Sequence, residues 1–484
     1  MQILSVPPAI MNWIHRISSR TIKRLLAVIG LSPFLASVAF ASPARPNVLF
    51  ILSDDLRPDL SCYGSYVETP NLDRLAGSGV RFANAWVQYP LCNPSRTSML
   101  TGRHPTTTGA LSNRNYFRDA YPEMVTLPQL FKNAGYDTLR IGKVFHDTAD
   151  DPISWTYGAK RAVGAPLSNK PYTMDMHRTN SDRIIILEGD GEAHSDYKIA
   201  DEAIAKLHEY ATNQKSFFMT CGLVKPHSPP TAPKKWFDSL PLNTIPLPVD
   251  FKPEADATPE FPAAALPPNG DLFIGRKASE EQAKEMIQAY QASVKWVDWN
   301  AGRVLDALRK LGLDKNTIVI FWGDHGYHLG EKGKWSKHGS LFNIGLRVPV
   351  IMAGPGIPKG GTSQRVVQSL DIFPTLAELC ALKAPAGIEG RSLVPLLRSP
   401  SADWSHPAYA VTYRGGKLHR AVRDDRFLYA EFDSGRAGAM LIDLKNDPRE
   451  LTNLVAKVEY REDLLRMKKL LAFLPSNPKA LPEY

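Results

Sequence analysis

The sequence predicts an α/β protein, built on a large mixed, mostly parallel sheet that is flanked by helices and followed by a smaller antiparallel subdomain. Two observations support this prediction. Apolar runs typical of buried strands alternate with segments of helical periodicity, and beyond about residue 396 the pattern changes to short strands joined by turns. A chain of 484 residues is also long enough to bury a large core.

The buried strands are predicted from continuous apolar runs. A strand of a parallel sheet is covered on both faces, so its sequence is apolar throughout rather than alternating. Residues 47–53, with the sequence NVLFILS, show this pattern. The same pattern predicts strands at residues 137–141, 216–222, 317–322 and 348–353.

The clearest helix is predicted over residues 281–311. Met286, Tyr290 and Val297 belong to a series of apolar residues with helical spacing, and Gly312 ends it. This stripe predicts core packing rather than a surface for a partner.

Two further regions complete the expected organisation. Residues 238–275 contain eight prolines and no periodicity, and we expect them to form a loop on the rim of the site. We assign residues 42–395 to a catalytic domain and 396–484 to a C-terminal subdomain. The short strands of that subdomain are predicted at 408–412, 418–422, 426–430 and 440–444.

Residues 1–41 resemble a secretory signal peptide. Four basic residues precede an apolar run, and Ala39-Phe40-Ala41 forms a small-x-small cleavage site. An uncleaved membrane anchor is the alternative, but the apolar run is short for a span. We therefore expect an exported protein, periplasmic or secreted, with no stable membrane insertion after cleavage.

The net charge of the chain limits the classes of binding partner that the sequence predicts. Cleavage would remove four basic and no acidic residues, so the formal charge would fall from +9 to +5. This balance suits a polyanionic substrate, although many other proteins share it. The absence of a basic run or an aromatic-basic repeat in the sequence argues against a nucleic-acid partner.

Of the four cysteines, Cys62 and Cys221 lie in or near predicted buried elements, which favours free thiols over disulfides.

Polar residues follow four of the predicted strands. They are Asp54 and Asp55 after the first, Lys143 and His146 after the second, His227 after the third, and Asp324 and His325 after the fourth. Ligands of an open α/β sheet bind beyond the carboxyl ends of its strands. We therefore expect these side chains to meet at one edge of the sheet.

The three aspartates predict a divalent cation. Asp54, Asp55 and Asp324 supply hard oxygen donors, and without a cation they would repel one another. Ca²⁺ is favoured over Mg²⁺ because its looser geometry tolerates mixed ligands. His325 is a softer ligand than Ca²⁺ usually takes. Taken alone, Asp54 and Asp55 would be read as an ordinary helix-capping pair.

The segment from Cys92 to Arg103 (CNPSRTSMLTGR) contains a candidate reactive residue. Pro94 suits the first turn of a helix and Gly102 suits its end. Cys92 is therefore expected just ahead of a short helix, beside unpaired backbone N–H groups that attract anions, with Arg96 about one turn further on. Taken alone, a cysteine before a helix could also be a small packed residue.

These motifs together resemble the type I sulfatases, and among them the iduronate-2-sulfatase branch. The resemblance extends from about residue 47 to 454 and rests on NVLFILSDDLRPDLSCYG, the cysteine string, residues 142–146 and 225–229, and FWGDHGYHLGEKGKWSK. It implies an alkaline-phosphatase-like sulfatase fold, one Ca²⁺, and oxidation of Cys92 to formylglycine by a maturation enzyme. Many sulfatases have Asn at the position of His325, whereas the iduronate branch has His.

The resemblance also implies the roles of individual residues. The implied metal set is Asp54, Asp55, Cys92 as formylglycine, Asp324 and His325, and the set around the sulfate is Arg96, Lys143, His146, His227 and Lys337. One hydroxyl of the formylglycine hydrate would attack sulfur, and loss of a proton from the other would expel sulfate as the aldehyde reforms. His227 would protonate the departing sugar oxygen, and His146 would orient or deprotonate the hydrate.

The implied activity is hydrolysis of a sulfate ester on a sulfated saccharide, in glycosaminoglycan or other polysaccharide degradation. The cationic sulfate site and the positive charge balance favour an acidic saccharide. We expect action at its exposed end, because residues 238–275 and the C-terminal subdomain could wall the cleft into a pocket. The sugar itself stays open, since a 2-O-sulfated uronate is one option among several. Two alternatives are a phosphatase or phosphonate hydrolase of the same superfamily, and a non-catalytic, metal-dependent glycan-binding protein.

Overall fold

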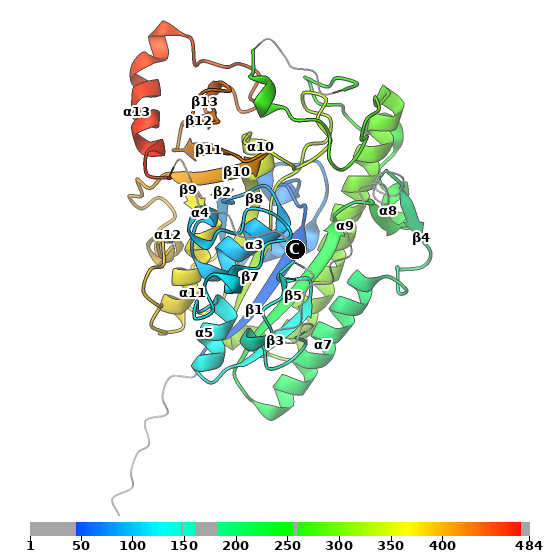
Figure 1. Cartoon of the computed structure of the whole chain (residues 1–484). Coiled ribbons are helices and arrows are strands. Elements are labelled where there is room, and N and C mark those ends of the chain that lie inside the picture. The colour runs from blue at the N-terminus through cyan, green and yellow to red at the C-terminus, as the bar shows by residue number, and fades with distance from the viewer. Residues whose placement is uncertain (1–44, 147–148, 160–181, 255–259, 476–484) are drawn as a thin grey trace, which may run out of the picture. The chain divides into compact units, whose positions relative to one another are not determined.

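The computed structural model describes residues 45–146, 149–159, 182–254 and 260–475. Its main sheet has seven strands in the order β3-β5-β1-β7-β8-β2-β9 (Figure 1). The strands are β1 (Asn47–Asp54), β2 (Gly79–Trp86), β3 (Asp137–Gly142), β5 (Phe217–Pro226), β7 (Thr317–Gly323), β8 (Arg347–Ala353) and β9 (Gly361–Gln368). β8 is antiparallel to β7 and β2, and the other neighbours are parallel, so the predicted mixed, mostly parallel sheet is confirmed. The predicted signal peptide lies outside the described residues.

All five predicted strands are present, whereas β2 and β9 were not predicted. β2 (GVRFANAW) carries Arg81 and Asn84 within its length, which interrupts the apolar run. β9 (GTSQRVVQ) is the last strand of the sheet and is only partly buried, so its sequence is largely polar. Their apolar residues, such as Phe82, Trp86 and Val366, are still buried in the core, but the polar residues between them hide the strand pattern in the sequence.

Helices cover both faces of this sheet, because alternate residues of each strand point to opposite faces. Val48 and Phe50 of β1 belong to one core cluster, and Leu49 and Ile51 belong to another. The helices are α2 (Pro70–Gly77), α3 (Cys92–Thr101), α4 (Pro105–Thr108), α5 (Leu127–Asn133), α7 (Ser195–Asn213), α8 (Lys234–Asp238), α9 (Glu280–Lys310), α10 (Asn343–Leu346), α11 (Ile372–Leu379), α12 (Val394–Arg398) and α13 (Arg461–Leu471). Residues of α3, α5 and α11 complete the first cluster, and residues of α7 and α9 complete the second.

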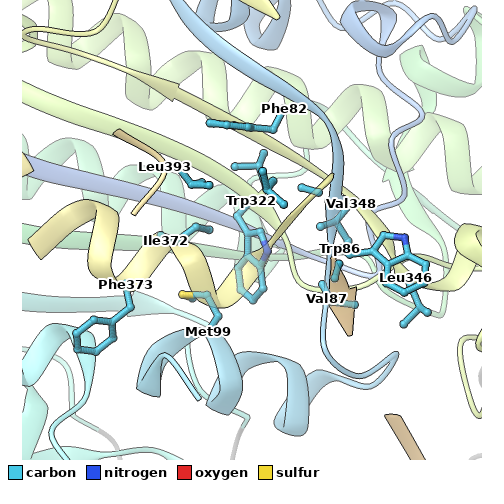
Figure 2. Close-up of a cluster of buried hydrophobic side chains, with 14 of the residues drawn as sticks. Phe82, Trp86, Val87, Met99, Trp322, Leu346, Val348, Ile372, Phe373 and Leu393 are labelled. Carbon is cyan, nitrogen blue, oxygen red and sulfur yellow. The ribbon is translucent and has the colours of Figure 1, made fainter. Parts of the chain in front are cut away.

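The helix that carries the cysteine, α3, is anchored in the first cluster. Figure 2 shows Met99 of α3 among Trp322 of β7 and Ile372 and Phe373 of α11. All ten residues of α3 are buried. Gly102 ends the helix in the left-handed region at φ 64°, as predicted.

The predicted helix 281–311 is α9, which begins one residue earlier and ends one residue earlier. Its start is stabilised by a capping box, in which the Ser279 side chain and the side chain of Gln282 each accept a hydrogen bond from the other's backbone N–H. Tyr290 of α9 reaches the edge of the sheet, where its hydroxyl donates a hydrogen bond to the carbonyl of Asp55 at 2.7 Å. The helix therefore supports the backbone of the expected site.

The predicted C-terminal strands form a separate antiparallel sheet in the order β10-β11-β12-β13. They are β10 (Ala408–Arg414), β11 (Lys417–Arg423), β12 (Phe427–Phe432) and β13 (Ala439–Asp443). One face of this sheet joins the first core cluster, and the other packs with α13. The assignment of residues 396–484 to a subdomain of their own stays a prediction.

All four cysteines carry free thiols, Cys62 being half-buried and the others buried. A search of the described residues finds no helix long and apolar enough to span a membrane.

Candidate active site

The two acidic strand ends meet because β1 and β7 are adjacent and parallel. Ser53 pairs with Gly323, and the residues that follow them turn toward each other. Asp324 donates its N–H to the Ser53 carbonyl at 3.1 Å, and Asp324 Oδ1 accepts from Asp55 N at 2.9 Å. Asp55 has φ 62°, a costly conformation for a side chain with a Cβ. Its hydrogen bonds to Asp324 and Tyr290 hold it there.

Cys92 points into this acidic edge. Its Sγ lies 3.3 Å from Asp54 Oδ1 and 3.3 Å from His325 Nε2, and that nitrogen lies 3.3 Å from Asp55 Oδ1. Ligand atoms of these four buried residues all lie within 4.8 Å of one another. Cys92 is the first residue of α3 rather than the residue before it. As predicted, Cys92 lies at the N-terminus of the helix, and only the first residue of the helix differs from the prediction.

Asp324 lies beside this group of four. Its Oδ2 accepts a hydrogen bond from Arg96 Nε at 2.8 Å and lies 3.6 Å from His325 Nε2. Its Oδ1 is engaged by the backbone of Asp55. The predicted role of Asp324 as a metal ligand stays a prediction.

Each of three predicted cationic residues lies closest to a different carboxylate, although Arg96 Nη2 also lies 3.6 Å from Asp54. Lys143 Nζ lies 2.5 Å from Asp54 Oδ2, and Lys337 Nζ lies 2.6 and 2.9 Å from the two oxygens of Asp55. Arg96 pairs with Asp324, and its Nη1 donates to the carbonyls of Lys143 and Val144 at 2.8 and 3.0 Å. The guanidinium therefore ties α3 to the loop that follows β3.

Burial is the largest single influence on the pKa values of the three site aspartates. It raises the pKa of Asp324 to about 7 and raises the pKa of Asp55, where Asp54 and Asp324 add repulsion against the attraction of Lys337. Asp54 differs, because the charges of Lys143 and Arg96 overcome the effect of burial and lower its pKa.

The donor set fits a divalent cation. Counting the buried groups in direct contact, four carboxylates (Asp54, Asp55, Asp271, Asp324) meet three cations (Arg96, Lys143, Lys337). A bound dication would change the formal charge of this set from −1 to +1, which favours an anionic substrate. Carboxylate oxygens suit Ca²⁺ or Mg²⁺, and the imidazole and sulfur are the softer members.

His227 lies in the loop between β5 and β6 (Thr231–Pro233). Its Nδ1 lies 2.7 Å from the Ser228 carbonyl oxygen. Because a carbonyl oxygen can only accept a hydrogen bond, Nδ1 carries the proton of the neutral ring and Nε2 carries the lone pair. Burial, assisted by the Lys337 charge, lowers the pKa of His227 to about 3. Lys225 holds the loop by donating from Nζ to the carbonyls of His227 and Pro229 at 2.7 and 2.8 Å.

His146 is half-buried and follows Lys143 by three residues. Arg96, through its bonds to the Lys143 and Val144 carbonyls, fixes the segment that leads to it. The structure thus brings Cys92, Arg96, Lys143 and Lys337 into direct contact with the acidic cluster. His227 lies on the loop after β5, and the position of His146 at the site stays a prediction.

Sequence reasoning missed Asp271, which lies in the proline-rich segment and 3.4 Å from Lys337 Nζ. The expectation that residues 238–275 line the rim of the site stays a prediction, and residues 255–259 of that segment lie outside the described residues. Nothing in the local sequence distinguishes Asp271 from the other acidic residues of a loop. Only its contacts, which come from segments distant in the chain, identify it.

A buried cysteine at a helix start therefore faces carboxylates at the ends of β1 and β7, in a cluster that could hold a metal ion. The chain matches the sulfatase family over residues 46–381, and the C-terminal region of N-sulphoglucosamine sulphohydrolase over residues 330–476. The protein belongs to the sulfatase family and is a sulfuric ester hydrolase, as the motifs predicted.

Individual relatives agree with this assignment. A sulfatase of Formosa agariphila is 35% identical over 453 residues, covering 88% of this chain and 86% of that protein. Human iduronate 2-sulfatase is 33% identical over 390 residues, covering 70% of each chain. A solved structure in complex with its substrate, D-glucosamine-2-N,6-O-disulfate, is 26% identical with a TM-score of 0.70, covering 89% of this chain and 97% of that one. The predicted fold is confirmed.

Proposed function

We propose that this protein is an exported, Ca²⁺-dependent sulfatase that hydrolyses a sulfate ester of an acidic saccharide, using Cys92 after its conversion to formylglycine. The observation that carries the proposal is the position of Cys92 Sγ, 3.3 Å from both Asp54 and His325. The sulfur marks the place where the oxygens of an aldehyde hydrate would stand. A nucleophile at that place would lie beside both the carboxylates and the cationic side chains.

The thiol itself is poorly suited to be the nucleophile. Burial, with repulsion from Asp54, raises the pKa of Cys92 well above its usual value. A thiol kept neutral in this way reacts slowly, since the thiolate is the reactive form. Conversion to formylglycine would replace it with a hydrate hydroxyl, which supports the proposed modification by a maturation enzyme.

The residues proposed to hold Ca²⁺ are Asp54, Asp55, Asp324, His325 and the modified Cys92. When bound, the cation would polarise the sulfuryl oxygens and the nucleophilic hydroxyl. Arg96, Lys143 and Lys337 would then stabilise the charge that develops on the sulfuryl group. These three side chains pair with carboxylates of the cluster, which supports their proposed role beside the reacting group.

His227 is proposed to protonate the departing sugar oxygen through Nε2. The ring is neutral in the free protein, because its pKa is lowered to about 3. An anionic substrate at this site would favour the protonated ring, since it adds negative charge beside it. His146 is proposed to orient or deprotonate the hydrate.

We infer the substrate class from the net charge of the protein and from the proteins to which it is similar. An iduronate 2-sulfatase and a structure with a disulfated glucosamine are both similar to this chain. The formal charge of +5 expected after signal cleavage would aid capture of a polyanion. We propose a sulfate ester at the end of a glycosaminoglycan or related acidic polysaccharide chain.

The experiment combines mass spectrometry with turnover. Purified protein coexpressed with a formylglycine-generating enzyme is digested, and the mass of the Cys92 peptide is compared with its thiol form. Sulfate release is then measured on a panel of sulfated disaccharides, with matched phosphate esters, before and after chelation. We expect the formylglycine mass, loss of activity on chelation and restoration by Ca²⁺. Full activity with unmodified Cys92, or preferred release of phosphate, would contradict the proposal.

A further inference from the structure

A carboxylate outside the predicted site, Asp271, joins two of the segments that form it. Asp271 is 7% exposed. Its Oδ1 accepts a hydrogen bond from Ser228 Oγ at 2.5 Å, and its Oδ2 accepts from the Tyr327 hydroxyl at 2.7 Å and lies 3.4 Å from Lys337 Nζ. One side chain therefore contacts both the residue after His227 and the loop that follows β7.

The backbone around Asp271 is fixed without its carboxylate. Leu272 donates its N–H to the Trp335 carbonyl at 3.1 Å, and Trp335 donates its own N–H to Asn269 Oδ1 at 2.8 Å. These bonds attach the segment to the loop that carries Lys337. A change of the Asp271 side chain therefore leaves the main attachments of the segment in place.

The charge of Asp271 acts on Lys337. The Lys337 ammonium contacts two carboxylates: Nζ lies 2.6 and 2.9 Å from the Asp55 oxygens and 3.4 Å from Asp271 Oδ2. Burial acts to raise the pKa of Asp271, but the charge of Lys337 and the donor Ser228 hold it below its usual range, so the group is ionised. Without this charge, Lys337 would pair more fully with Asp55 and compete with a cation for that carboxylate.

We propose that Asp271 is a positioning residue that holds the Lys337 ammonium and the His227 loop at a fixed separation. This inference rests on the proposed function, in which Lys337 stabilises the sulfuryl charge and His227 protonates the leaving oxygen. Both charges develop in the same transition state, so both groups must be in place together. Asp271 acts through these two residues rather than on the substrate.

The test compares Asp271→Asn with Asp250→Asn. Asp250 lies in the same proline-rich segment and pairs with Lys332, a lysine of the same loop after β7, at 2.8 Å. We expect Asp271→Asn to lower kcat by roughly 10- to 100-fold while KM changes by less than about threefold. Asp250→Asn should keep kcat within about twofold.

A second readout does not depend on turnover. Ca²⁺ affinity is measured by calorimetry on preparations with equal formylglycine content. Asp271→Asn should bind Ca²⁺ about 10-fold more weakly, because a nearby negative charge is lost and Lys337 shifts toward Asp55. Asp250→Asn should bind it as the unaltered protein does.

A milder variant, Ser228→Ala, removes one hydroxyl that donates to Asp271 and should lower kcat about threefold to tenfold. The inference is overturned if Asp271→Asn folds and matches Asp250→Asn in kcat and Ca²⁺ affinity. If Asp271→Asn does not fold, unchanged kcat in Ser228→Ala overturns it. Failure of the proposed function would be seen separately, as unaltered protein with converted Cys92 that releases no sulfate.

Discussion

The ring of His325 faces the thiol of Cys92, with Nε2 3.3 Å from Sγ, although the two residues are 233 positions apart in the chain. His325 follows the end of β7 and Cys92 begins α3. His325 Nδ1 lies 3.1 Å from the Gly326 carbonyl, which fixes the ring so that Nε2 points at the cluster. This pair joins the proposed nucleophile to the proposed cation site.

Replacing Cys92 with Ala should abolish turnover, by at least about 10⁴-fold, because no other side chain can form the aldehyde hydrate. The fold should survive, since the change removes a single sulfur. Sulfate release and thermal unfolding are measured on the same preparation. Substantial sulfate release by this variant would contradict the role given to Cys92.

A matched pair of variants tests His325. Asn carries an oxygen donor that suits Ca²⁺, so His325→Asn should retain cation binding within about 10-fold, whereas His325→Ala should lose about 100-fold. Calorimetric titration with Ca²⁺ measures both. Equal affinity in the two variants would mean that the side chain at this position is not a ligand.

Met99→Ala tests the anchoring of α3. Met99 is fully buried in the cluster that contains Trp322 and Phe373 (Figure 2), so truncation should leave a cavity. We expect a loss of about 2–5 kcal/mol in the free energy of unfolding. Denaturant titration measures it, and Leu465→Ala, an exposed position on α13, is the control, with an expected change below about 0.5 kcal/mol. Equal losses in the two variants would show that Met99 does not anchor the helix.

Acid should destabilise the fold partly through His104. This ring is buried against the edges of Tyr409 and Phe473, and burial lowers its pKa from 6.5 to about 4. The unfolded chain then binds a proton that the folded chain does not, so stability falls as the pH drops from 6.5 toward 4. His104→Phe keeps an aromatic ring but cannot titrate. Between pH 7 and pH 5, its free energy of unfolding should fall by about 2 kcal/mol less than that of the unaltered protein. Parallel pH profiles would refute this origin.

The sequence alone determined the elements whose signal is local. Buried strands such as β1 are apolar over their whole length, α9 keeps one periodicity over 31 residues, and the string around Cys92 combines a helix start with the sulfatase motif. Because polar residues follow parallel strands directly, the meeting of Asp54 and Asp324 at one edge could also be predicted.

Only the tertiary structure determined the features that no local sequence pattern indicates. β9 is polar because it lies at the end of the sheet, and it exists through its pairing with β2. Asp271 became a member of the site only because Ser228, Tyr327 and Lys337 are brought to it from other segments. The pairing of each cation with a particular carboxylate is likewise a matter of distances between side chains. Such contacts depend on packing between residues far apart in the chain, and no pattern of neighbouring residues encodes them.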